Sequence, residues 1–411
     1  MNDRNEMSSD RREFLQRVGT AAVVGTSIAA LSHSGPIRGA DAPDAKVDLP
    51  RRKLGNTGVD VTILNQGTWQ SPSLDRLVRF SYANGVRYFD TAKAYGTEPG
   101  LAKWLTAEPE VRKSIFLVTK DHPNTPKALI AQLDQRLASL KTDYVDLFFI
   151  HGIGSDYPDV SIDWPKSQEF KETIAAIKKS GKAKFVGFSC HDQKRAAYLR
   201  SAAEGGFVDA IMVQHTAWLD RETELNKALD ACHKRGIGLI SMKQIAGPNP
   251  KDFLAEVPKK APDLIAKGLS PFGALLHAIW TDERFATCCV SMKNTDQIRE
   301  NVAAARSFAP LKTAEIESVR QAFLASRPTL CAACDGRCSE AAGTEAPLGD
   351  LTRYLTYYER HGSLAAARRA YAELSEAGRD WAGADLEAAR AACPSHLDFA
   401  SLMPRVSRHL A

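Results

Sequence analysis

The sequence predicts an α/β fold, a closed (β/α)8 (TIM) barrel, with an N-terminal signal segment and a small helical, cysteine-bearing C-terminal extension. Two observations predict the barrel. From residue 51 onward, short apolar runs rich in Val, Ile, Leu and Phe alternate with longer runs of helical periodicity. Eight such strand–helix units follow one another without a hairpin that would reverse the sheet. We expect the signal segment and linker over residues 1–45, the barrel over 50–310 and the extension over 311–411.

The predicted strands and helices can be placed from local patterns. Helical periodicity is clear over residues 128–140 and 170–180, and the second run stops before Gly181, a common residue after a helix end. A doubly wound open sheet is the alternative fold, but residues 66–70 (QGTWQ) lack the glycine-rich fingerprint expected after its first strand. The eight strands are expected to end at Gln66-Gly67, Asp90, Lys120, His151, Ser189, Gln214, Met242 and Ser291.

The N-terminal residues have the features of an export signal. Residues 8–16 (SSDRREFLQ) resemble the twin-arginine (Tat) motif, and an apolar stretch follows over residues 18–31. That stretch is too short and too often interrupted by Gly, Thr and Ser for a stable membrane span in the mature protein. We therefore expect export through the Tat machinery to the periplasm, with a short amphipathic surface helix as the alternative.

The charge of the chain is mild and evenly distributed. The net charge is +5 at pH 7, and Lys and Arg are spread along the chain rather than packed into a block. This distribution argues against nucleic acid as the main partner.

Ionisable residues stand at the ends of three successive predicted strands. Asp90, Lys120 and His151 occupy these ends, and Tyr95 lies just beyond the first. In a (β/α)8 barrel the C-terminal ends of the strands carry the active site. Singly, each residue has a structural explanation: a helix cap, an ion pair, a core histidine or a rim aromatic. Together they predict a catalytic site.

Four motifs in order resemble those of the aldo-keto reductases. They are RKLGNTGV (52–59), FDTAKAYG (89–96), VTK (118–120) and DYVDLFFIH (143–151), within a resemblance that covers residues 50–310. The resemblance implies reduction of a small-molecule carbonyl, or oxidation of an alcohol, with a nicotinamide cofactor. Tyr95 would be the general acid and base, and Lys120 would lower its pKa from about 10. Asp90 would hold Lys120, and His151 would bind the substrate oxygen.

The resemblance also implies residues for the cofactor, NADP or NAD. Ser189 and Gln214 match family positions for the nicotinamide carboxamide, and Lys243 can present a cation to the pyrophosphate. Glu300 and Asn301 resemble the adenine-binding pair, although a solvated helix face is the alternative. The sequence departs from the family at Cys190, and at Ser291 and Gln297 where basic groups often hold the 2′-phosphate. Those departures leave the choice between NADP and NAD open.

Four of the eight cysteines lie in the C-terminal extension. CAACDGRC (331–338) and the distant Cys393-Pro394 resemble ferredoxin-like ligation, with Cys331, Cys334, Cys338 and Cys393 holding a [4Fe–4S] cluster. The helical segment 350–358 is also similar to the ferredoxin-like tails of some aldo-keto reductases. Disulfides, which an oxidising compartment favours, and an all-cysteine zinc site are the alternatives.

We therefore predict an exported oxidoreductase whose cofactor travels tightly bound, with the cluster or a redox partner protein supplying electrons. The alternative is a catalytically altered barrel that acts as a binding or electron-relay module, with a zinc- or disulfide-stapled tail. The loops around the predicted pocket carry no recognisable signal for the substrate.

Overall fold

The computed structural model describes residues 48–154, 157–219, 221–244, 250–326, 328–329, 331, 336–361 and 364–411. The chain divides into two units, residues 1–44 and residues 45–411, and the second unit contains all the helices and strands named below. The predicted signal segment and Cys334 lie outside the described residues.

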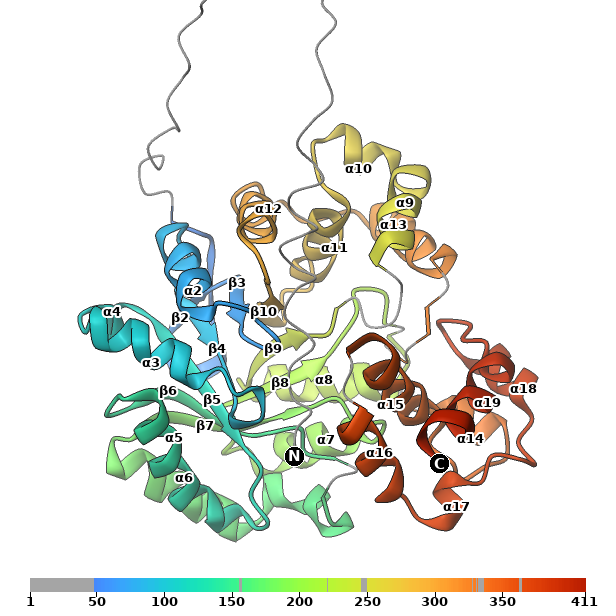
Figure 1. Ribbon diagram of the computed structural model, residues 1–411, viewed down its shortest axis with the longest axis horizontal. Helices are drawn as coiled ribbons and strands as arrows, with labels where there is room; N and C mark the ends of the chain where they lie inside the picture. Colours follow the sequence, from blue (N-terminus) through green and yellow to red (C-terminus); the bar gives the residue numbers. More distant parts are fainter. Residues whose placement is uncertain are drawn as a thin grey trace, which may run out of the picture. The chain divides into compact units, whose positions relative to one another are not determined.

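Eight parallel strands close into a barrel with the order β10-β3-β4-β5-β6-β7-β8-β9 (Figure 1). Successive strands are neighbours, and the barrel closes where β10 pairs with β3. Their side chains are almost all buried because one face of the sheet lines the barrel interior and the other meets the helices. The predicted fold class is confirmed, and each predicted strand end lies within one residue of the observed one. The strands are β3 (Leu64–Gly67), β4 (Tyr88–Asp90), β5 (Phe116–Asp121), β6 (Val145–Ile150), β7 (Ala183–Cys190), β8 (Ala210–Gln214), β9 (Gly238–Met242) and β10 (Phe285–Ser291).

Amphipathic helices surround the strands and bury their apolar sides against them. In the helix predicted over 170–180, the Ser167 hydroxyl accepts a hydrogen bond from the Phe170 N–H at the start, and Gly181 ends the helix with φ of 74°. The outer helices are α2 (Leu74–Ala83), α3 (Glu98–Ala107), α4 (Val111–Ser114), α5 (Leu129–Leu140), α6 (Gln168–Ser180), α7 (Arg195–Gly205), α8 (Glu224–Lys234), α11 (Pro271–Trp280) and α12 (Thr295–Arg306).

A short hairpin closes the N-terminal end of the barrel. It consists of β1 (Arg51–Lys53) and β2 (Asp60–Thr62), and its residues Leu54 and Val61 join the apolar core inside the barrel. Gly55 has φ of 53°, and a Cβ there would lie 2.2 Å from the carbonyl oxygen of Gly236. This close fit leaves the opposite end, where the strands terminate, as the place for a ligand.

Helices after the barrel contribute to two further apolar cores, and the helical extension predicted from the sequence is present. α13 (Thr313–Ala325) packs against α9 (Pro250–Lys260) and α11, near α10 (Pro262–Ala266). A separate core lies among the remaining helices, with Leu351, Tyr354, Phe399 and Met403 buried in it. These helices are α14 (Arg337–Ala341), α15 (Leu348–His361), α16 (Leu364–Ala372), α17 (Glu376–Arg379), α18 (Leu386–Ala392) and α19 (Phe399–Leu410).

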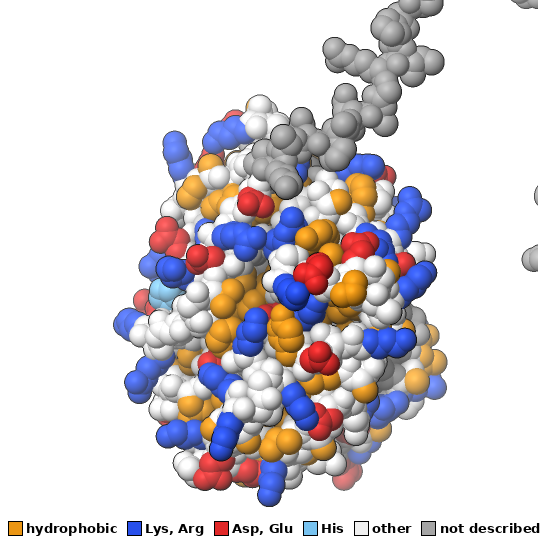
Figure 2. Space-filling model, turned by 90° about the vertical axis from the view of Figure 1, so that its left-hand side faces the viewer, with side chains coloured by type: hydrophobic (Ala, Val, Ile, Leu, Met, Phe, Trp, Pro, Cys, Tyr) orange, Lys and Arg blue, Asp and Glu red, His pale blue; other side chains and the backbone are white. Residues whose placement is uncertain are grey.

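The surface seen in Figure 2 mixes both signs of charge with apolar side chains. Within the part of the chain that the structure describes, no helix has the length and apolar character needed to cross a membrane.

Candidate active site

Three neighbouring strands bring the predicted catalytic residues to one end of the barrel. Asp90 is the last residue of β4, Lys120 lies near the end of β5, and His151 follows β6. Tyr95 ends the short 3-10 turn Lys93–Tyr95, which follows β4. Because β4, β5 and β6 are adjacent and parallel, their carboxyl ends meet at the same rim.

Asp90 and Lys120 form a buried ion pair. Lys120 Nζ lies 2.5 Å from Asp90 Oδ1 and donates a second hydrogen bond, of 2.8 Å, to the carbonyl oxygen of Thr91. The side chains of Lys120 and Asp90 are only 1% and 2% exposed. An ammonium buried this deeply needs such partners, because its desolvation would otherwise cost several kcal/mol. Burial raises the pKa of Asp90 above its ordinary value, and the charge of Lys120 offsets part of that shift.

Tyr95 and His151 face each other beside this pair. The Tyr95 hydroxyl lies 3.5 Å from His151 Nε2, and the two rings meet edge to face at 84°. The Lys120 ammonium lies 5.1 Å from the centre of the Tyr95 ring. Burial, with the charge of Lys120, lowers the pKa of His151 well below 6.5, so its imidazole is neutral at pH 7. A phenol and a neutral imidazole therefore converge where a carbonyl oxygen can bind.

The expected effect of Lys120 on Tyr95 is wrong for this structure. Burial, followed by the negative charge of Asp90, raises the pKa of Tyr95 well above 10. Two features explain the difference. Asp90 largely neutralises Lys120, and the Lys120 ammonium lies over the ring of Tyr95. The phenol therefore stays protonated at neutral pH, which suits a proton donor better than a base.

The residues predicted for the nicotinamide and the pyrophosphate lie at the ends of β7, β8 and β9. The Ser189 hydroxyl accepts a 2.8 Å hydrogen bond from the N–H of Gly152. The side-chain amide of Gln214 donates to the carbonyl oxygen of Cys331 at 2.6 Å, and Lys243 Nζ donates to the hydroxyl of Tyr357. Both of these acceptors belong to the C-terminal extension, so the extension contacts the predicted cofactor side of the barrel.

The predicted adenine-binding residues lie on α12. Asn301 is buried in this helix, and Glu300 is half-exposed. The basic groups nearby already have partners: Arg299 pairs with Asp296 at 2.8 Å, and Lys293 Nζ donates to the side chain of Gln70 at 3.2 Å.

The donor set is chemically suited to a nicotinamide nucleotide. A hydroxyl and an amide at adjacent strand ends, Ser189 and Gln214, can hydrogen-bond a carboxamide, and the ammonium of Lys243 suits a pyrophosphate. Two of these groups would have to exchange partners, because Gln214 and Lys243 are held by the extension. The chemical types of these side chains therefore suit the cofactor, and the extension is part of the same site.

Three of the predicted cluster cysteines share the core of the extension. Cys338 on α14 and Cys393 after α18 are buried in it, and Cys331 packs against it. α14 and α18 pack against each other. Cys334 lies outside the described residues. Among the residues that are described, no group of three or more His, Cys, Asp or Glu side chains is placed to hold a metal ion.

Several residues at this end of the barrel are not among the site residues predicted from the sequence. Tyr357 and Arg353 lie on α15, and Arg353 donates to the carbonyl oxygen of His191 at 3.2 Å. The ring of His122 lies 4.5 Å from that of His151. These neighbours arise from contacts between distant parts of the chain; the similarity of residues 350–358 to ferredoxin-like tails singles out that segment but not its contact with the barrel.

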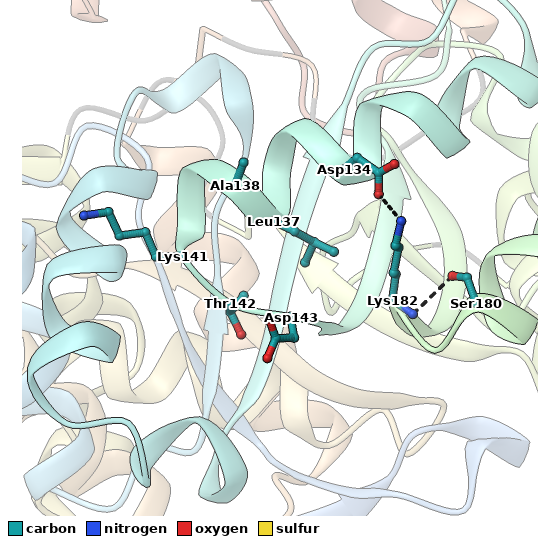
Figure 3. A pocket seen from close by; sticks show the side chains of 8 residues that line it. All are labelled: Asp134, Leu137, Ala138, Lys141, Thr142, Asp143, Ser180 and Lys182. Carbon is teal, nitrogen blue, oxygen red and sulfur yellow. Dashed lines mark hydrogen bonds and ion pairs between the residues drawn. The ribbon is translucent and has the colours of Figure 1, made fainter.

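A surface depression at the opposite end of the barrel is unrelated to these residues. It is formed by the end of α5 and the turns that lead into β6 and β7, where Lys182 pairs with Asp134 at 2.6 Å (Figure 3). The depression is lined by Asp134, Leu137, Ala138, Lys141, Thr142, Asp143, Ser180 and Lys182.

Comparison with known proteins identifies relatives of the barrel. Residues 63–255 match the model of the Aldo/keto reductase family. The chain is 27% identical to the uncharacterized oxidoreductase YrpG of Bacillus subtilis over 47% of this chain and 66% of that protein. It is 22% identical to L-glyceraldehyde 3-phosphate reductase of Escherichia coli O157:H7, over 68% of this chain and 94% of that one. The aldo-keto reductase AKR11C1 from Bacillus halodurans (holo form) has the same fold, with a TM-score of 0.53 and 21% identity over 67% and 96% of the two chains.

Proposed function

We propose that this chain, an oxidoreductase with an aldo/keto reductase family domain, reduces a small-molecule carbonyl group with Tyr95 as the proton donor. One observation carries the proposal. At one rim of the barrel a protonated phenol and a neutral imidazole, 3.5 Å apart, stand beside a buried ammonium–carboxylate pair. This is the arrangement of groups that can bind, polarise and protonate a carbonyl oxygen.

Each of the four residues has a task in this reaction. His151 Nε2 and the Tyr95 hydroxyl bind the substrate oxygen, and Tyr95 transfers its proton there. Lys120 lies beside the Tyr95 ring, where its positive charge offsets part of the unfavourable effect that burial and Asp90 have on the phenolate that remains. Asp90 keeps Lys120 charged and in place. In the reverse direction the Tyr95 oxygen would accept the alcohol proton only after losing its own, which its raised pKa disfavours at neutral pH.

The proposed cofactor is NADP or NAD, which supplies the hydride when it is bound. Ser189 and Gln214 would hold its carboxamide, Lys243 its pyrophosphate, and Glu300 and Asn301 its adenine. Ser189, Gln214 and Lys243 stand at the ends of β7, β8 and β9, and Glu300 and Asn301 lie on α12, the helix that follows β10.

The proposed cellular setting is export in the folded state through the Tat machinery to the periplasm. Free nicotinamide is not expected there, so the nucleotide would be retained by the protein. We further propose a [4Fe–4S] cluster on Cys331, Cys334, Cys338 and Cys393 that exchanges electrons with a redox partner protein. The support is the shared core that holds three of these cysteines, and the hydrogen bond from Gln214 to the backbone of Cys331.

Replacing Tyr95 by Phe tests the reductase assignment. The variant keeps the ring and removes only the hydroxyl, so the fold should be unaffected. Loss of a general acid should lower kcat by about 10²- to 10⁴-fold in aldehyde reduction followed by nicotinamide absorbance. A variant that still turns over at the wild-type rate would rule out Tyr95 as the proton donor. A wild-type protein that binds no nucleotide would instead favour a barrel that serves only as a binding or relay module.

A further inference from the structure

Asp121 is a buried carboxylate beside the active site that has no task in the proposed reaction. It is the last residue of β5 and follows Lys120 directly, and its side chain is 1% exposed. Successive side chains of a strand point to opposite faces of the sheet. Asp121 therefore points away from Lys120 and toward the helices, where its carboxylate meets Arg136 of α5. A carboxylate buried this deeply needs partners, and those partners connect it to the elements that carry the catalytic residues.

The first oxygen of the Asp121 carboxylate contacts the turn that presents Tyr95. Oδ1 lies 3.4 Å from Nζ of Lys93, the first residue of the 3-10 turn Lys93–Tyr95. A single 3-10 turn is held by few hydrogen bonds of poor geometry, so its position depends on contacts with its surroundings. The ion pair anchors this turn to the end of β5, two residues before the phenol of Tyr95.

The second oxygen of Asp121 connects β5 to the helix that follows the turn. Oδ2 lies 3.1 Å from Nε of Arg136, and Nη1 of the same guanidinium donates a 2.8 Å hydrogen bond to Oε2 of Glu98. Glu98 begins α3, three residues after Tyr95, and its Oε1 accepts a 2.8 Å hydrogen bond from the hydroxyl of Thr119 on β5. α3 and α5 pack against each other (Figure 1). The chain is therefore tied to β5 on both sides of the phenol.

Asp121 also contacts the segment that carries His151. Its backbone carbonyl oxygen accepts a 2.8 Å hydrogen bond from the N–H of His151. Its Oδ1 accepts another, also of 2.8 Å, from the N–H of His122, whose ring centre lies 4.5 Å from that of His151. One residue thus connects the two groups that bind the substrate oxygen in the proposed reaction, the phenol of Tyr95 and the imidazole of His151.

We propose that Asp121 is a positioning residue for the carbonyl reduction, an inference that rests on the proposed function. Its negative charge, held between Lys93 and Arg136, keeps the Tyr95 turn against the end of β5. The turn keeps the phenol 3.5 Å from Nε2 of His151, where both groups can reach one carbonyl oxygen. Asp121 acts through the turn and not on the substrate.

Asp121→Asn in the full-length protein removes the charge and keeps the shape of the side chain. The amide oxygen can still accept from the N–H of His122, and Arg136 keeps its pair with Glu98, so the variant should fold. It should lower kcat for aldehyde reduction by about 10- to 100-fold, the scale expected when a reacting group moves by about 1 Å. Each kcat is divided by the number of nucleotide sites measured by calorimetry, so that unfolded protein is not counted.

Lys93→Met and the double variant show whether Asp121 acts through the turn. Lys93 is half-exposed, so its replacement should leave the fold intact. It should lower kcat by about 3- to 10-fold, less than Asp121→Asn because the pair with Arg136 remains. Asp121→Asn/Lys93→Met should be no slower than Asp121→Asn alone, because the single variant has already broken the pair. Losses that multiply, or a kcat of Asp121→Asn within about 2-fold of the wild type, would overturn the inference.

Two matched controls change the same residue types on the same two helices. Lys103→Met, on α3, removes an ion pair with Asp75 at 3.3 Å, and Asp134→Asn, on α5, removes one with Lys182 at 2.6 Å. Neither pair contacts Asp121 or the turn, so kcat should equal that of the wild type. A control that loses as much activity as Asp121→Asn would show a general effect of lost surface charge and would refute the positioning role.

Crystal structures of the wild type and of Asp121→Asn test the geometry without turnover. The distance from the Tyr95 hydroxyl to Nε2 of His151 should grow by at least about 0.5 Å in the variant, the tolerance within which catalytic groups are held. An unchanged distance would overturn the inference even if the wild type reduces aldehydes. A longer distance in the variant of a protein that reduces no aldehyde would support the positioning of Tyr95 by Asp121 and refute the reductase assignment.

Discussion

Breaking the Asp90–Lys120 pair should destabilise the barrel far more than its single ion pair suggests. In Asp90→Asn the Lys120 ammonium keeps its hydrogen bond to Thr91 but loses its counter-charge at a position that is 1% exposed. Removing one partner of a buried pair leaves an uncompensated charge and typically costs about 3–5 kcal/mol. With a urea slope of about 3 kcal/mol per M, the midpoint should fall by about 1–2 M.

The double variant Asp90→Asn/Lys120→Met should recover most of this loss. It removes both charges, and buried pairs replaced by uncharged side chains are often nearly neutral in stability. A matched control is Glu110→Gln, which breaks the surface pair with Lys113, whose side chains are 84% and 73% exposed. Its effect should stay below about 1 kcal/mol.

Urea unfolding followed by circular dichroism measures all three variants, and aldehyde reduction is assayed in parallel. Both variants that change Asp90 should lose activity, although only the single one should lose much stability. If Asp90→Asn unfolds within about 1 kcal/mol of the wild type, Lys120 is not charged in the folded protein, and its proposed electrostatic role fails.

Three further predictions concern acid stability, the cysteines and export. Burial lowers the pKa of His215 to about 4. Between about pH 6.5 and pH 4 the unfolded chain therefore binds a proton that the folded chain does not. About 3 kcal/mol of the free energy of unfolding should be lost over that range. His215→Gln should flatten that part of the pH–stability curve, and an unchanged curve would contradict the assignment. Anaerobically purified protein should be brown and contain iron. Cys338→Ala should lose both the colour and the iron, whereas the control Cys232→Ala, in α8, should keep them. Zinc or no metal in the wild type would refute the cluster. Replacing Arg11 and Arg12 by Lys should abolish export, which fractionation of cells measures, and unimpaired export would exclude the Tat route.

Local patterns were sufficient to predict the barrel and its rim. A buried parallel strand needs a short apolar run, and a helix needs its own periodicity, so both can be recognised without distant contacts. Since strand ends follow from these runs, the sequence also predicted that Asp90, Lys120 and His151 would lie at successive ends. Their meeting follows from the order of strands, because β4, β5 and β6 are neighbours.

Tertiary structure alone decided the electrostatics of Tyr95 and the position of the extension. The pKa of Tyr95 depends on how deeply the phenol is buried and on where Asp90 and Lys120 lie around it. The identities of these residues in the sequence do not give those positions. The pairs Gln214–Cys331 and Lys243–Tyr357 join residues more than a hundred positions apart, and no sequence periodicity relates them. Only the packing of the folded extension brings these groups to the mouth of the barrel.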